Sequence, residues 1–568
     1  MPSARSALVA ATSAVVANAA SLSDICTTSY AAAALPADAV PGITIDSSSL
    51  TTAIVSNSSV TSEWYPSAVI DYCNVTFAYS HNGLTDDIVH VSYLLPAPDS
   101  FEGRYVSTGG GGLAINSGSS YSPSGIIVGA VSGITDGGFG NFDTQFDAVF
   151  LAANDTINWQ ATYMFGYQAH HELAVLGKAY TANLYNVTDK VYSYYQGCSE
   201  GGREGWSQVQ RFADQFDGAA IGAPAFRYGQ QQVNHLSPAV IQQDIGYTPP
   251  PCALETITNL TIAFCDPLDG LTDGVIARSD LCLLQMDFNS TVGKPYSCAA
   301  TAASAFGSAV PAQNGSITAQ DAANYKAVID GLHDSDGKRV YINFQIGSDN
   351  TEAESTYDST TGTWAFTPSG LGGEWVARFL ELQDADNIDS LTNVTADTLR
   401  NWMSLGMNRY YDSLQTNWPD LSAVKSAGTK VIHLHGEQDN SIPTASSVHY
   451  YESVRNILYP DMGFNESTAA MDEFYRLFLV PGGAHCMSNT LQANGGWPQD
   501  TLQQVIDWVE NDNAPATLNN SGTVITELCS WPLRPLWSGN GTSFDCVYDQ
   551  SSIDSWMYEF DAFNVPIY

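Results

Sequence analysis

The stretch that decides the fold runs from Val191 to Arg203 and reads V-Y-S-Y-Y-Q-G-C-S-E-G-G-R. Its first five residues are typical of a strand, and the residues from Arg203 onward are typical of a helix. The turn between them follows the pattern G-x-S-x-G, with Ser199 at its centre. A sharp strand-to-helix turn strains the serine and brings neighbouring backbone so close that flanking side chains must be absent. We therefore predict that Ser199 is a nucleophile at a helix N-terminus, where N–H groups can stabilise a developing anion.

Strands and helices alternate on both sides of this turn. Strand-like runs precede it at 90–95 and 103–107, a helical pattern covers 159–178, and apolar strands return at 430–434 and 475–480. Alternation of this kind indicates a mainly parallel sheet covered by helices. Together with the serine turn, it predicts an α/β fold with an α/β-hydrolase core.

A chain of 568 residues is too long for one compact core. The region from 227 to 399 breaks the strand–helix rhythm and carries four of the ten cysteines and a loop rich in Gly and Asp. We predict a catalytic domain of residues 20–226 and 400–568, interrupted by a large inserted lid domain of residues 227–399. Insertions that cover a pocket are where such enzymes place specificity.

A serine hydroxyl is a poor nucleophile and needs a base. In this fold the acid and then the histidine follow the serine along the chain, each in a loop after a strand. Asp439 follows the strand 431–435, and His485 lies in a glycine-rich loop after the strand 477–480. The sequence therefore predicts a catalytic triad of Ser199, Asp439 and His485.

Other side chains compete for these roles. Glu437 is a rival acid, but the Ile-Pro pair that follows Asp439 matches the expected turn better. His433 and His435 alternate on the strand, so we expect them to be core or rim residues with satisfied hydrogen bonds rather than bases.

The same template predicts an oxyanion hole. One donor is the N–H of Glu200, the residue after the nucleophile, and the second comes from an early glycine-rich loop. The run Gly109–Gly112 occupies that place, with Gly111 or Gly112 as the donor. A flexible hinge is the alternative interpretation of this run.

Two cysteines flank the predicted active-site residues. Cys198 directly precedes the nucleophile, and Cys486 directly follows the base. If Ser199 and His485 lie within hydrogen-bond reach, about 3 Å, these chain neighbours are forced close together. They could then meet the roughly 4.4–6.8 Å Cα spacing of a disulfide. We predict a Cys198–Cys486 bridge that clamps nucleophile and base together.

The segment 265–275 spaces Asp266, Asp269 and Asp273 around two glycines. Calcium prefers about six to eight oxygen ligands, drawn from carboxylates and carbonyls. We predict a structural Ca²⁺ site in which the carbonyls of Leu271 and Val275 complete the shell of the three carboxylates. An ordinary Asp/Gly surface turn is the alternative, and no organic cofactor is expected.

The N-terminus has the pattern of a secretory signal peptide over residues 1–19. Arg5 precedes an apolar run from Ala7 to Ala17, with small residues at the cleavage positions. No later stretch approaches about twenty uninterrupted apolar residues, the length that spans a membrane. We therefore expect a secreted, extracellular protein with no membrane anchor.

Two further features agree with export. The even number of cysteines, ten, predicts disulfides. The density of Asn-x-Ser/Thr sequons predicts a glycosylated surface. They lie at Asn57, Asn74, Asn154, Asn186, Asn259, Asn289, Asn314, Asn393, Asn465, Asn519 and Asn540.

The charge balance is strongly acidic. The chain carries 20 Lys and Arg against 59 Asp and Glu, a formal net charge of −39. Such a field repels nucleic acid and anionic membranes. We therefore expect neither as a partner, and a neutral or weakly acidic small molecule as the substrate. The sequence leaves a homo-oligomer open.

The motifs above resemble those of the fungal tannase and feruloyl esterase family of α/β-hydrolases. The resemblance rests on Cys198-Ser199, Asp439, His485-Cys486 and the calcium-type loop, and it covers nearly the whole chain. The segments 195–205 and 553–556 resemble the tannase branch in particular. The resemblance implies a lid domain, a structural calcium and the Cys198–Cys486 bridge. It also implies the pairs Cys26–Cys73, Cys265–Cys282 and Cys529–Cys546, after which Cys252–Cys298 remains.

The resemblance also implies an activity. It suggests a serine esterase that hydrolyses galloyl ester and depside bonds of hydrolysable tannins and releases gallic acid through an acyl-enzyme. The alternative keeps the triad and changes the acyl group, giving a feruloyl esterase that releases ferulic acid from plant cell-wall polysaccharide. A non-catalytic binding protein on a hydrolase fold is disfavoured by the complete triad, and a secreted peptidase by the tannase-like segments. The lid residues that bind the acyl group stay open at the level of sequence.

Overall fold

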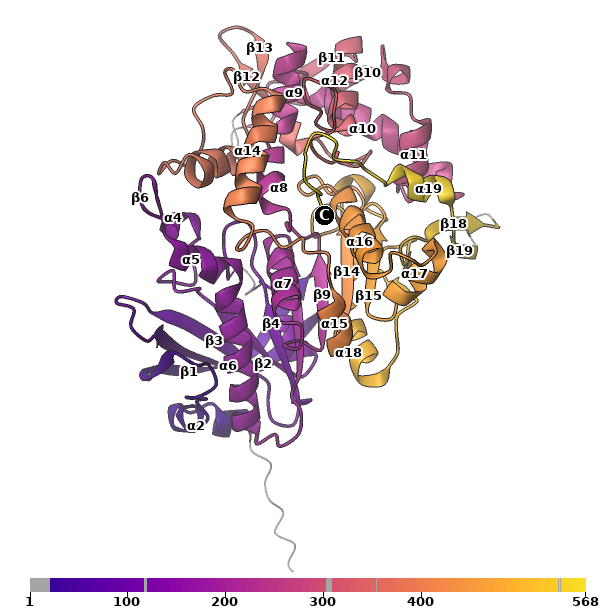
Figure 1. Ribbon diagram of the computed structural model, residues 1–568. Coiled ribbons are helices and arrows are strands. Elements are labelled where there is room, and N and C mark those ends of the chain that lie inside the picture. The colour runs from indigo at the N-terminus through magenta and orange to yellow at the C-terminus, as the bar shows by residue number, and fades with distance from the viewer. Residues whose placement is uncertain (1–20, 117–119, 303–308, 354, 540, 542) are drawn as a thin grey trace, which may run out of the picture.

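The computed structural model describes residues 21–116, 120–302, 309–353, 355–539, 541 and 543–568 (Figure 1). The predicted signal peptide and the sequon at Asn540 lie outside these residues. The N-terminal part of the chain forms the lower left of Figure 1, the C-terminal part the right, and the middle of the chain the upper region.

The centre of the molecule is a mixed sheet. Within the described residues it has nine strands in the order β1-β2-β3-β5-β4-β8-β9-β14-β15. Neighbouring strands from β1 to β5 pair antiparallel, and those from β5 to β15 pair parallel. In that order, the strands are Ile43–Ser62, Tyr65–His81, Val89–Leu95, Ala130–Thr135, Arg104–Thr108, Tyr192–Cys198, Gly218–Gly222, Lys430–Gly436 and Tyr475–Val480.

Helices cover both faces of the parallel part. Successive residues of a strand point to opposite faces, and in β8 they enter two different cores. Tyr195 packs in the core that contains Trp206 of α7 (Glu200–Arg211), whereas Tyr194 packs in the core that contains Val505 of α18 (Thr501–Asn511). Strands buried on both faces read as continuous apolar runs. The predicted α/β-hydrolase core is confirmed.

The remaining elements outside the middle region are short or flank the sheet. Helices α3 (Pro123–Ile127), α6 (Ala169–Tyr185) and α16 (Ala445–Leu458) also pack against sheet strands. The others are α1 (Leu22–Ile25), α2 (Thr28–Ala33), α4 (Asp147–Phe150), β6 (Leu151–Ala153), β7 (Thr156–Ile157), α5 (Trp159–Tyr163), α17 (Phe464–Met471), β16 (Thr517–Asn519), β17 (Glu527–Cys529), β18 (Arg534–Ser538), β19 (Ser543–Val547) and α19 (Gln550–Ser555).

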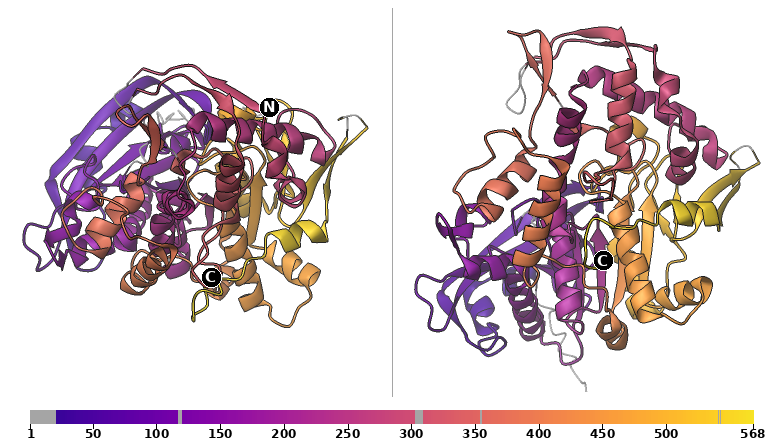
Figure 2. Two further views of the ribbon diagram at one scale, coloured as in Figure 1. Left: turned by 90° about the horizontal axis from the view of Figure 1, so that it is seen from above. Right: turned by 45° about the horizontal axis from the view of Figure 1, so that its top comes forward.

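The chain between β9 and β14 contributes no strand to the central sheet in the described residues. Residues 228–409 of this segment form the upper region of the molecule and lie over one end of the sheet, whereas residues 422–427 lie low in Figure 1 and contact α7 (Figures 1 and 2). The elements of the segment are α8 (Tyr228–Asn234), α9 (Ser237–Ile245), α10 (Pro251–Cys265), α11 (Ser279–Gln285), β10 (Pro295–Cys298), β11 (Gln313–Ser316), α12 (Ala319–Asp330), β12 (Ser355–Asp358), β13 (Thr363–Phe366), α13 (Gly370–Glu374), α14 (Ala396–Arg409) and α15 (Ser422–Ala427).

This insertion has a small core of its own. Leu254, Ile257 and Tyr325 belong to an apolar cluster made largely of insertion residues. Helix α14 runs through the predicted domain boundary at 399/400 and packs against α8. By its packing, this helix belongs with the insertion.

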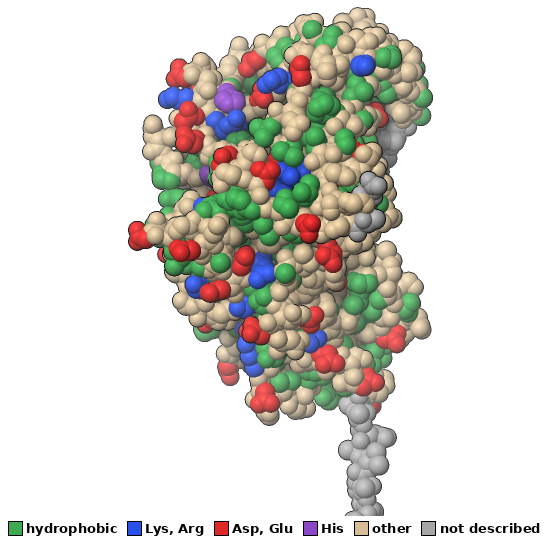
Figure 3. Space-filling view, turned by 90° about the vertical axis from the view of Figure 1, so that its right-hand side faces the viewer, with side chains coloured by type: hydrophobic (Ala, Val, Ile, Leu, Met, Phe, Trp, Pro, Cys, Tyr) green, Lys and Arg blue, Asp and Glu red, His purple; other side chains and the backbone are tan. Residues whose placement is uncertain are grey.

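Five disulfides tie the fold together. They are Cys26–Cys73, Cys198–Cys486, Cys252–Cys298, Cys265–Cys282 and Cys529–Cys546, the five pairs expected from the sequence, with Cα separations of 5.2–6.1 Å. In the part of the chain that the structure describes, no helix is long and apolar enough to cross a membrane. Figure 3 shows Asp and Glu side chains dispersed over one face, with Lys and Arg among them, rather than gathered into one patch.

Candidate active site

The serine turn has the strained geometry that its glycines predict. Strand β8 ends at Cys198, helix α7 begins at Glu200, and Ser199 between them has φ 62° and ψ −122°. This is a left-handed conformation that few residues other than glycine adopt. A Cβ at Gly202 would lie 2.4 Å from the Gly222 carbonyl oxygen. The backbone crowding explains why a side chain there is excluded.

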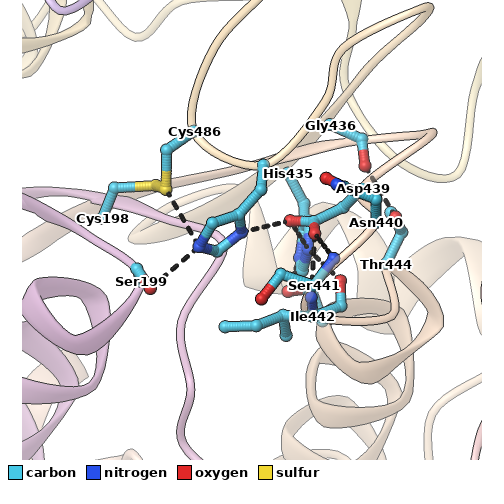
Figure 4. Close-up of polar contacts among 12 residues, drawn as sticks. Cys198, Ser199, His435, Gly436, Asp439, Asn440, Ser441, Ile442, Thr444 and Cys486 are labelled. Atoms are coloured by element: carbon cyan, nitrogen blue, oxygen red, sulfur yellow. Dashed lines mark hydrogen bonds and ion pairs between the residues drawn. A yellow bond between two sulfur atoms is a disulfide. The ribbon is translucent and has the colours of Figure 1, made fainter. Parts of the chain in front are cut away.

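Asp439, His485 and Ser199 form a hydrogen-bonded row, and Figure 4 shows Ser199 and Asp439 at its two ends. His485 Nε2 lies 2.9 Å from Ser199 Oγ, and His485 Nδ1 lies 2.8 Å from Asp439 Oδ2. The other carboxylate oxygen of Asp439 accepts hydrogen bonds of 2.8 Å from the backbone N–H groups of Ser441 and Ile442. The three residues predicted as a triad therefore meet, in the order that acyl transfer needs.

Electrostatics set the protonation states of this row. Burial alone would raise the pKa of Asp439, but the charge on His485 and hydrogen bonds from His435 and His485 hold it well below its ordinary value. Burial lowers the pKa of His485, while the carboxylates of Asp439 and Glu352 raise it, and the net result lies above 6.5. Asp439 is thus an anion that fixes the Nδ1–H tautomer of His485 and leaves Nε2 free to take the serine proton.

Glu437, the rival acid, points elsewhere. Its carboxylate accepts hydrogen bonds from Ser279 Oγ and from Arg534 Nη2, the latter at 2.7 Å. Glu437 and Arg534 are both buried. This pair joins the loop after β14 to the C-terminal part of the chain and takes no part in the row.

A second histidine, His435, also contacts Asp439. His435 Nε2 lies 3.1 Å from Asp439 Oδ2 and 3.0 Å from the carbonyl oxygen of Ile442. A carbonyl can only accept, so this nitrogen carries the proton and donates. In the neutral imidazole, His435 Nδ1 then accepts from the Ser447 hydroxyl at 2.6 Å.

The same logic orients the next two groups. Ser447 Oγ, having donated to His435, accepts from His433 Nε2 at 2.8 Å. His433 Nδ1 in turn accepts from the Tyr475 hydroxyl at 2.8 Å, because burial lowers the pKa of His433 well below 6.5 and keeps it neutral. Every donor in this buried chain points toward Asp439. His433 and His435 are core residues, as expected, but no pattern in the sequence indicated their link to the acid.

The predicted oxyanion loop lies against the start of α7. The N–H of Gly201 donates to the Gly110 carbonyl at 3.0 Å, and the N–H of Gly110 donates to Glu204 Oε2 at 2.7 Å. The N–H of Gly111 is already bonded to the Ala114 carbonyl at 3.0 Å. This leaves Gly112, which lines a pocket together with Ser199 and Glu200, as the candidate second donor.

The Cys198–Cys486 bridge clamps the two reactive loops. Its Cα separation is 6.1 Å, and Cys486 Sγ lies 3.8 Å from His485 Nε2 (Figure 4). The carbonyl of Cys486 also accepts a 2.9 Å hydrogen bond from Trp64 Nε1. Residues far apart in the sequence are thereby held at a fixed distance beside the nucleophile.

The insertion forms the roof of the pocket. Tyr228, Gln231, Gln232 and His235 follow one another at helical spacing along α8 and its C-cap, and all four line the same pocket as Ser199. Ser441 and Ile442 of the acid loop and Leu371 at α13 also line it. The roof is therefore rich in amide, imidazole and phenol groups.

The predicted calcium segment folds into a tight loop. One oxygen of each carboxylate caps backbone: Asp266 accepts from the N–H of Asp273 at 2.8 Å, Asp269 from Leu271 at 2.9 Å, and Asp273 from Val275 at 3.0 Å. The second oxygens of Asp269 and Asp273 are buried without a partner in the described chain. Burial and mutual repulsion raise the pKa of Asp269 to about 7 and that of Asp273 to about 6.

These two unpaired carboxylate oxygens fit a cation. Among the described residues, however, no group of three or more His, Cys, Asp or Glu side chains is arranged to hold a metal ion. A calcium ion here would therefore also need backbone carbonyl ligands, such as those of Leu271 and Val275. Such carbonyls are common ligands of calcium in proteins.

The sequon asparagines lie mostly on the surface. Asn74 is half-buried and accepts a 2.6 Å hydrogen bond from the Ser92 hydroxyl. The remaining sequon asparagines in the described residues are exposed.

Comparison with known proteins agrees with the geometry. A family model described as tannase and feruloyl esterase matches residues 73–553. The chain is 47% identical to a tannase of Aspergillus oryzae over 97% of both chains, and 32% identical to a probable feruloyl esterase of Arthroderma benhamiae over 86% of this chain and 88% of that one. A solved tannin acyl hydrolase from Aspergillus niger superposes with a TM-score of 0.93 at 52% identity, over 96% of this chain and 99% of its own. The chain belongs to the tannase and feruloyl esterase family.

Proposed function

We propose that this protein hydrolyses galloyl ester and depside bonds of hydrolysable tannins and releases gallic acid. It is a carboxylic ester hydrolase. The observation that carries the proposal is the row in which His485 bridges Ser199 and Asp439 at 2.9 and 2.8 Å. The likeness to tannases of two Aspergillus species over nearly the whole chain supports the galloyl acyl group.

The first half of the cycle acylates the serine. His485 Nε2 takes the proton of Ser199 Oγ as that oxygen attacks the ester carbonyl. The N–H groups of Glu200 and Gly112 stabilise the tetrahedral oxyanion. The intermediate collapses, the alcohol leaves with the proton from His485, and a galloyl ester on Ser199 remains.

The second half releases the acid. Water enters in place of the alcohol, and His485 takes one of its protons as the oxygen attacks the acyl-enzyme. The second tetrahedral intermediate then collapses, His485 returns the proton to Ser199 Oγ, and the acid is released. Asp439 stays ionised throughout and stabilises the imidazolium formed in each half.

Feruloyl ester hydrolysis is the second candidate. It is supported by the 32% identity to a probable feruloyl esterase and by a family model that covers both activities. The two activities share the triad and differ in the acyl pocket, because ferulate carries a methoxy group and a longer vinyl spacer.

Three accessory properties belong to the same proposal. Asp266, Asp269 and Asp273, with the carbonyls of Leu271 and Val275, hold a structural Ca²⁺ that stabilises the insertion. The protein is secreted after loss of residues 1–19, and its exposed sequons carry glycans. The disulfides, which persist in oxidising compartments, support export.

The direct test compares the rates on methyl gallate and methyl ferulate, with Ser199→Ala as the blank. A preference for methyl gallate is expected, with no turnover by the variant. A preference for methyl ferulate would move the protein to the second candidate, and equal turnover by wild type and Ser199→Ala would overturn the mechanism.

A further inference from the structure

Helix α7 buries a carboxylate that the proposed reaction does not use. Glu204 lies in the second turn of this helix, which begins at Glu200, and it is 1% exposed. A buried carboxylate is costly unless hydrogen bonds satisfy it, and Glu204 Oε1 has no hydrogen-bond partner among the described residues. The contacts of the other oxygen, Oε2, therefore indicate why a charged side chain is kept beside the nucleophile.

Glu204 Oε2 holds the glycine loop 109–112 by its backbone. It accepts a 2.7 Å hydrogen bond from the N–H of Gly110. The carbonyl of the same glycine accepts a 3.0 Å hydrogen bond from the N–H of Gly201. Both backbone polar groups of Gly110 are therefore bonded to α7. Because a charged acceptor makes the stronger hydrogen bond, the side chain of Glu204 supplies the stronger of these two links.

The other polar groups near Oε2 do not compete for it. The Tyr195 hydroxyl lies 3.5 Å away, but it donates its one proton to the Gly201 carbonyl at 2.6 Å. His170 Nε2 lies 3.0 Å from Oε2, but the two atoms lack the geometry of a hydrogen bond. The bond from Gly110 is therefore the short hydrogen bond that this oxygen makes among the described residues.

The contact is possible because no side chain separates the loop from the helix. A Cβ at Gly109 would lie 2.5 Å from Gly201 Cα and 2.8 Å from Glu204 Oε2. Carbon atoms in contact lie about 3.5–4.0 Å apart, so a side chain at this position would push the loop away from α7. Close approach of two backbones explains the glycine here.

We propose that Glu204 is a positioning residue of the oxyanion hole, which fixes the Gly110 peptide against α7 and so sets the direction of the Gly112 N–H. Gly112 follows two residues later and lines the pocket with Ser199. The two proposed donors then depend on one helix, because Glu200 is its first residue and Glu204 holds the loop that carries Gly112.

This role acts on the rate and not on substrate binding. The donors must lie about 2.7–3.1 Å from the developing oxyanion, and a displacement of about 1 Å can cost about 100-fold in rate. The inference rests on the proposed serine mechanism and adds to it a residue that does not touch the substrate.

The test separates the reach of the side chain from its charge. Glu204→Gln keeps an acceptor at the same reach and loses the charge, Glu204→Asp keeps the charge and is one methylene shorter, and Glu204→Met has neither. Gln208→Met is the matched control. Gln208 lies one turn further along α7, is fully buried and donates a 2.9 Å hydrogen bond to the Tyr167 carbonyl, outside the glycine loop.

Each variant is measured for kcat, KM and the inhibition constant of phenylboronic acid. The substrate is methyl gallate or methyl ferulate, whichever wild type hydrolyses faster, and Ser199→Ala is the blank. Phenylboronic acid adds to a serine hydroxyl as a tetrahedral anion, so it reports on the oxyanion hole in the way that a transition-state analogue does.

We expect Glu204→Met to lower kcat by about 10- to 100-fold and to weaken phenylboronic acid binding by a similar factor, with KM nearly unchanged. Glu204→Gln should keep kcat close to that of wild type, and Glu204→Asp should be slower than Glu204→Gln. In Gln208→Met all three constants should stay close to those of wild type, whatever the loss of stability.

The outcomes that overturn the inference are equally specific. One is a folded Glu204→Met variant with wild-type kcat and boronate affinity, and another is an equal loss of kcat in Gln208→Met. If Glu204→Met does not fold, the two polar variants decide: Glu204→Asp at least as active as Glu204→Gln would show that charge matters and reach does not. Turnover by Ser199→Ala would instead overturn the proposed mechanism, so the two failures can be told apart.

Discussion

The serine turn and the roof line the same pocket but are built in opposite ways. At the turn, Ser199 is fixed by a left-handed backbone, by glycines that no side chain could replace and by a disulfide. At the roof, the Gln231 amide is held by hydrogen bonds to the Ser441 carbonyl and to His235, and its Oε1 has no partner among the described residues.

The difference separates the residues that carry out the reaction from those that line the pocket around the substrate. The reacting atoms need one geometry for every ester, which backbone and covalent constraints supply. Insertions that cover a pocket are where such enzymes place specificity, and hydrogen-bonding side chains on an inserted segment can be changed without disturbing the turn. Changes at the turn should therefore reduce turnover of every ester, and changes at the roof should alter the ratio between esters.

The largest effect is expected from the triad. Ser199→Ala and His485→Ala should each lower kcat on methyl gallate by about 10⁴- to 10⁶-fold, and the double variant should lose no more than either single one. The reason is that His485 takes the Ser199 proton in the same step in which Ser199 Oγ attacks the ester carbonyl, so that losing either residue abolishes that step. Steady-state rates with matched circular dichroism spectra check this, and losses that multiply in the double variant would show that the two residues act independently.

Opening the clamp should have the next largest effect. The Cys198→Ala/Cys486→Ala double variant should lower kcat about 10- to 100-fold, because small displacements of reacting groups are costly. It should also lower the free energy of unfolding by about 2–5 kcal/mol.

The matched control removes a bridge remote from the row. Cys529→Ala/Cys546→Ala should reduce stability but leave kcat within about twofold, because Cys529–Cys546 joins none of the loops that carry the triad. Denaturant unfolding and kcat together make the comparison. Equal losses of kcat in the two double variants would contradict the clamp.

Replacing His435, which contacts Asp439, should change the pH dependence of kcat/KM. In His435→Leu, Asp439 loses a donor and becomes more basic, so it holds the proton on His485 more strongly. Because His485 must be neutral to act as the base, the acid limb of kcat/KM should move to higher pH, by about 1 unit, and kcat should fall about tenfold.

The control for this prediction keeps a donor at the same place. His435→Gln can still donate to Asp439 and should keep the acid limb near that of wild type. Other charges near the row, those of Asp439 and Glu352, are unchanged in both variants. Identical acid limbs in His435→Leu and wild type would contradict a link through Asp439.

The smallest effect on turnover is expected from calcium removal. Chelation should lower Tm by about 5 °C and leave the initial rate at 25 °C within about twofold, because the carboxylates of the loop hydrogen-bond to the loop's own backbone and not to the triad. Asp273→Asn should abolish the difference in Tm between calcium and chelator. A Tm that does not respond to calcium in wild type would argue for a plain surface turn.

The sequence predicted the turn far better than the roof, for physical reasons. Strained backbone next to Ser199 restricts residue types, so glycines and the flanking Cys198 leave a pattern that can be recognised. The segment with His485 and Cys486 leaves a similar pattern, because glycines precede the base and a cysteine directly follows it. The role of Asp439 could be predicted from the order of triad residues along the chain and from its place in a loop after a strand.

The roof leaves no such pattern. Glutamines such as Gln231 occur on many helices, and only the fold brings one amide between Ser441 and His235. The link from His435 to Asp439 also depends on the turn of the loop after β14, which a strand pattern does not encode. The sequence does not distinguish Gly111 from Gly112 as the second oxyanion donor. The structure does, because the N–H of Gly111 already donates to the Ala114 carbonyl.

The most direct test of the central claim is active-site labelling with a fluorophosphonate, followed by peptide mass mapping during loss of gallate turnover. We expect one label per chain, on Ser199, with turnover falling in proportion to the labelled fraction. A label on another residue, or turnover that survives complete labelling of Ser199, would contradict the claim.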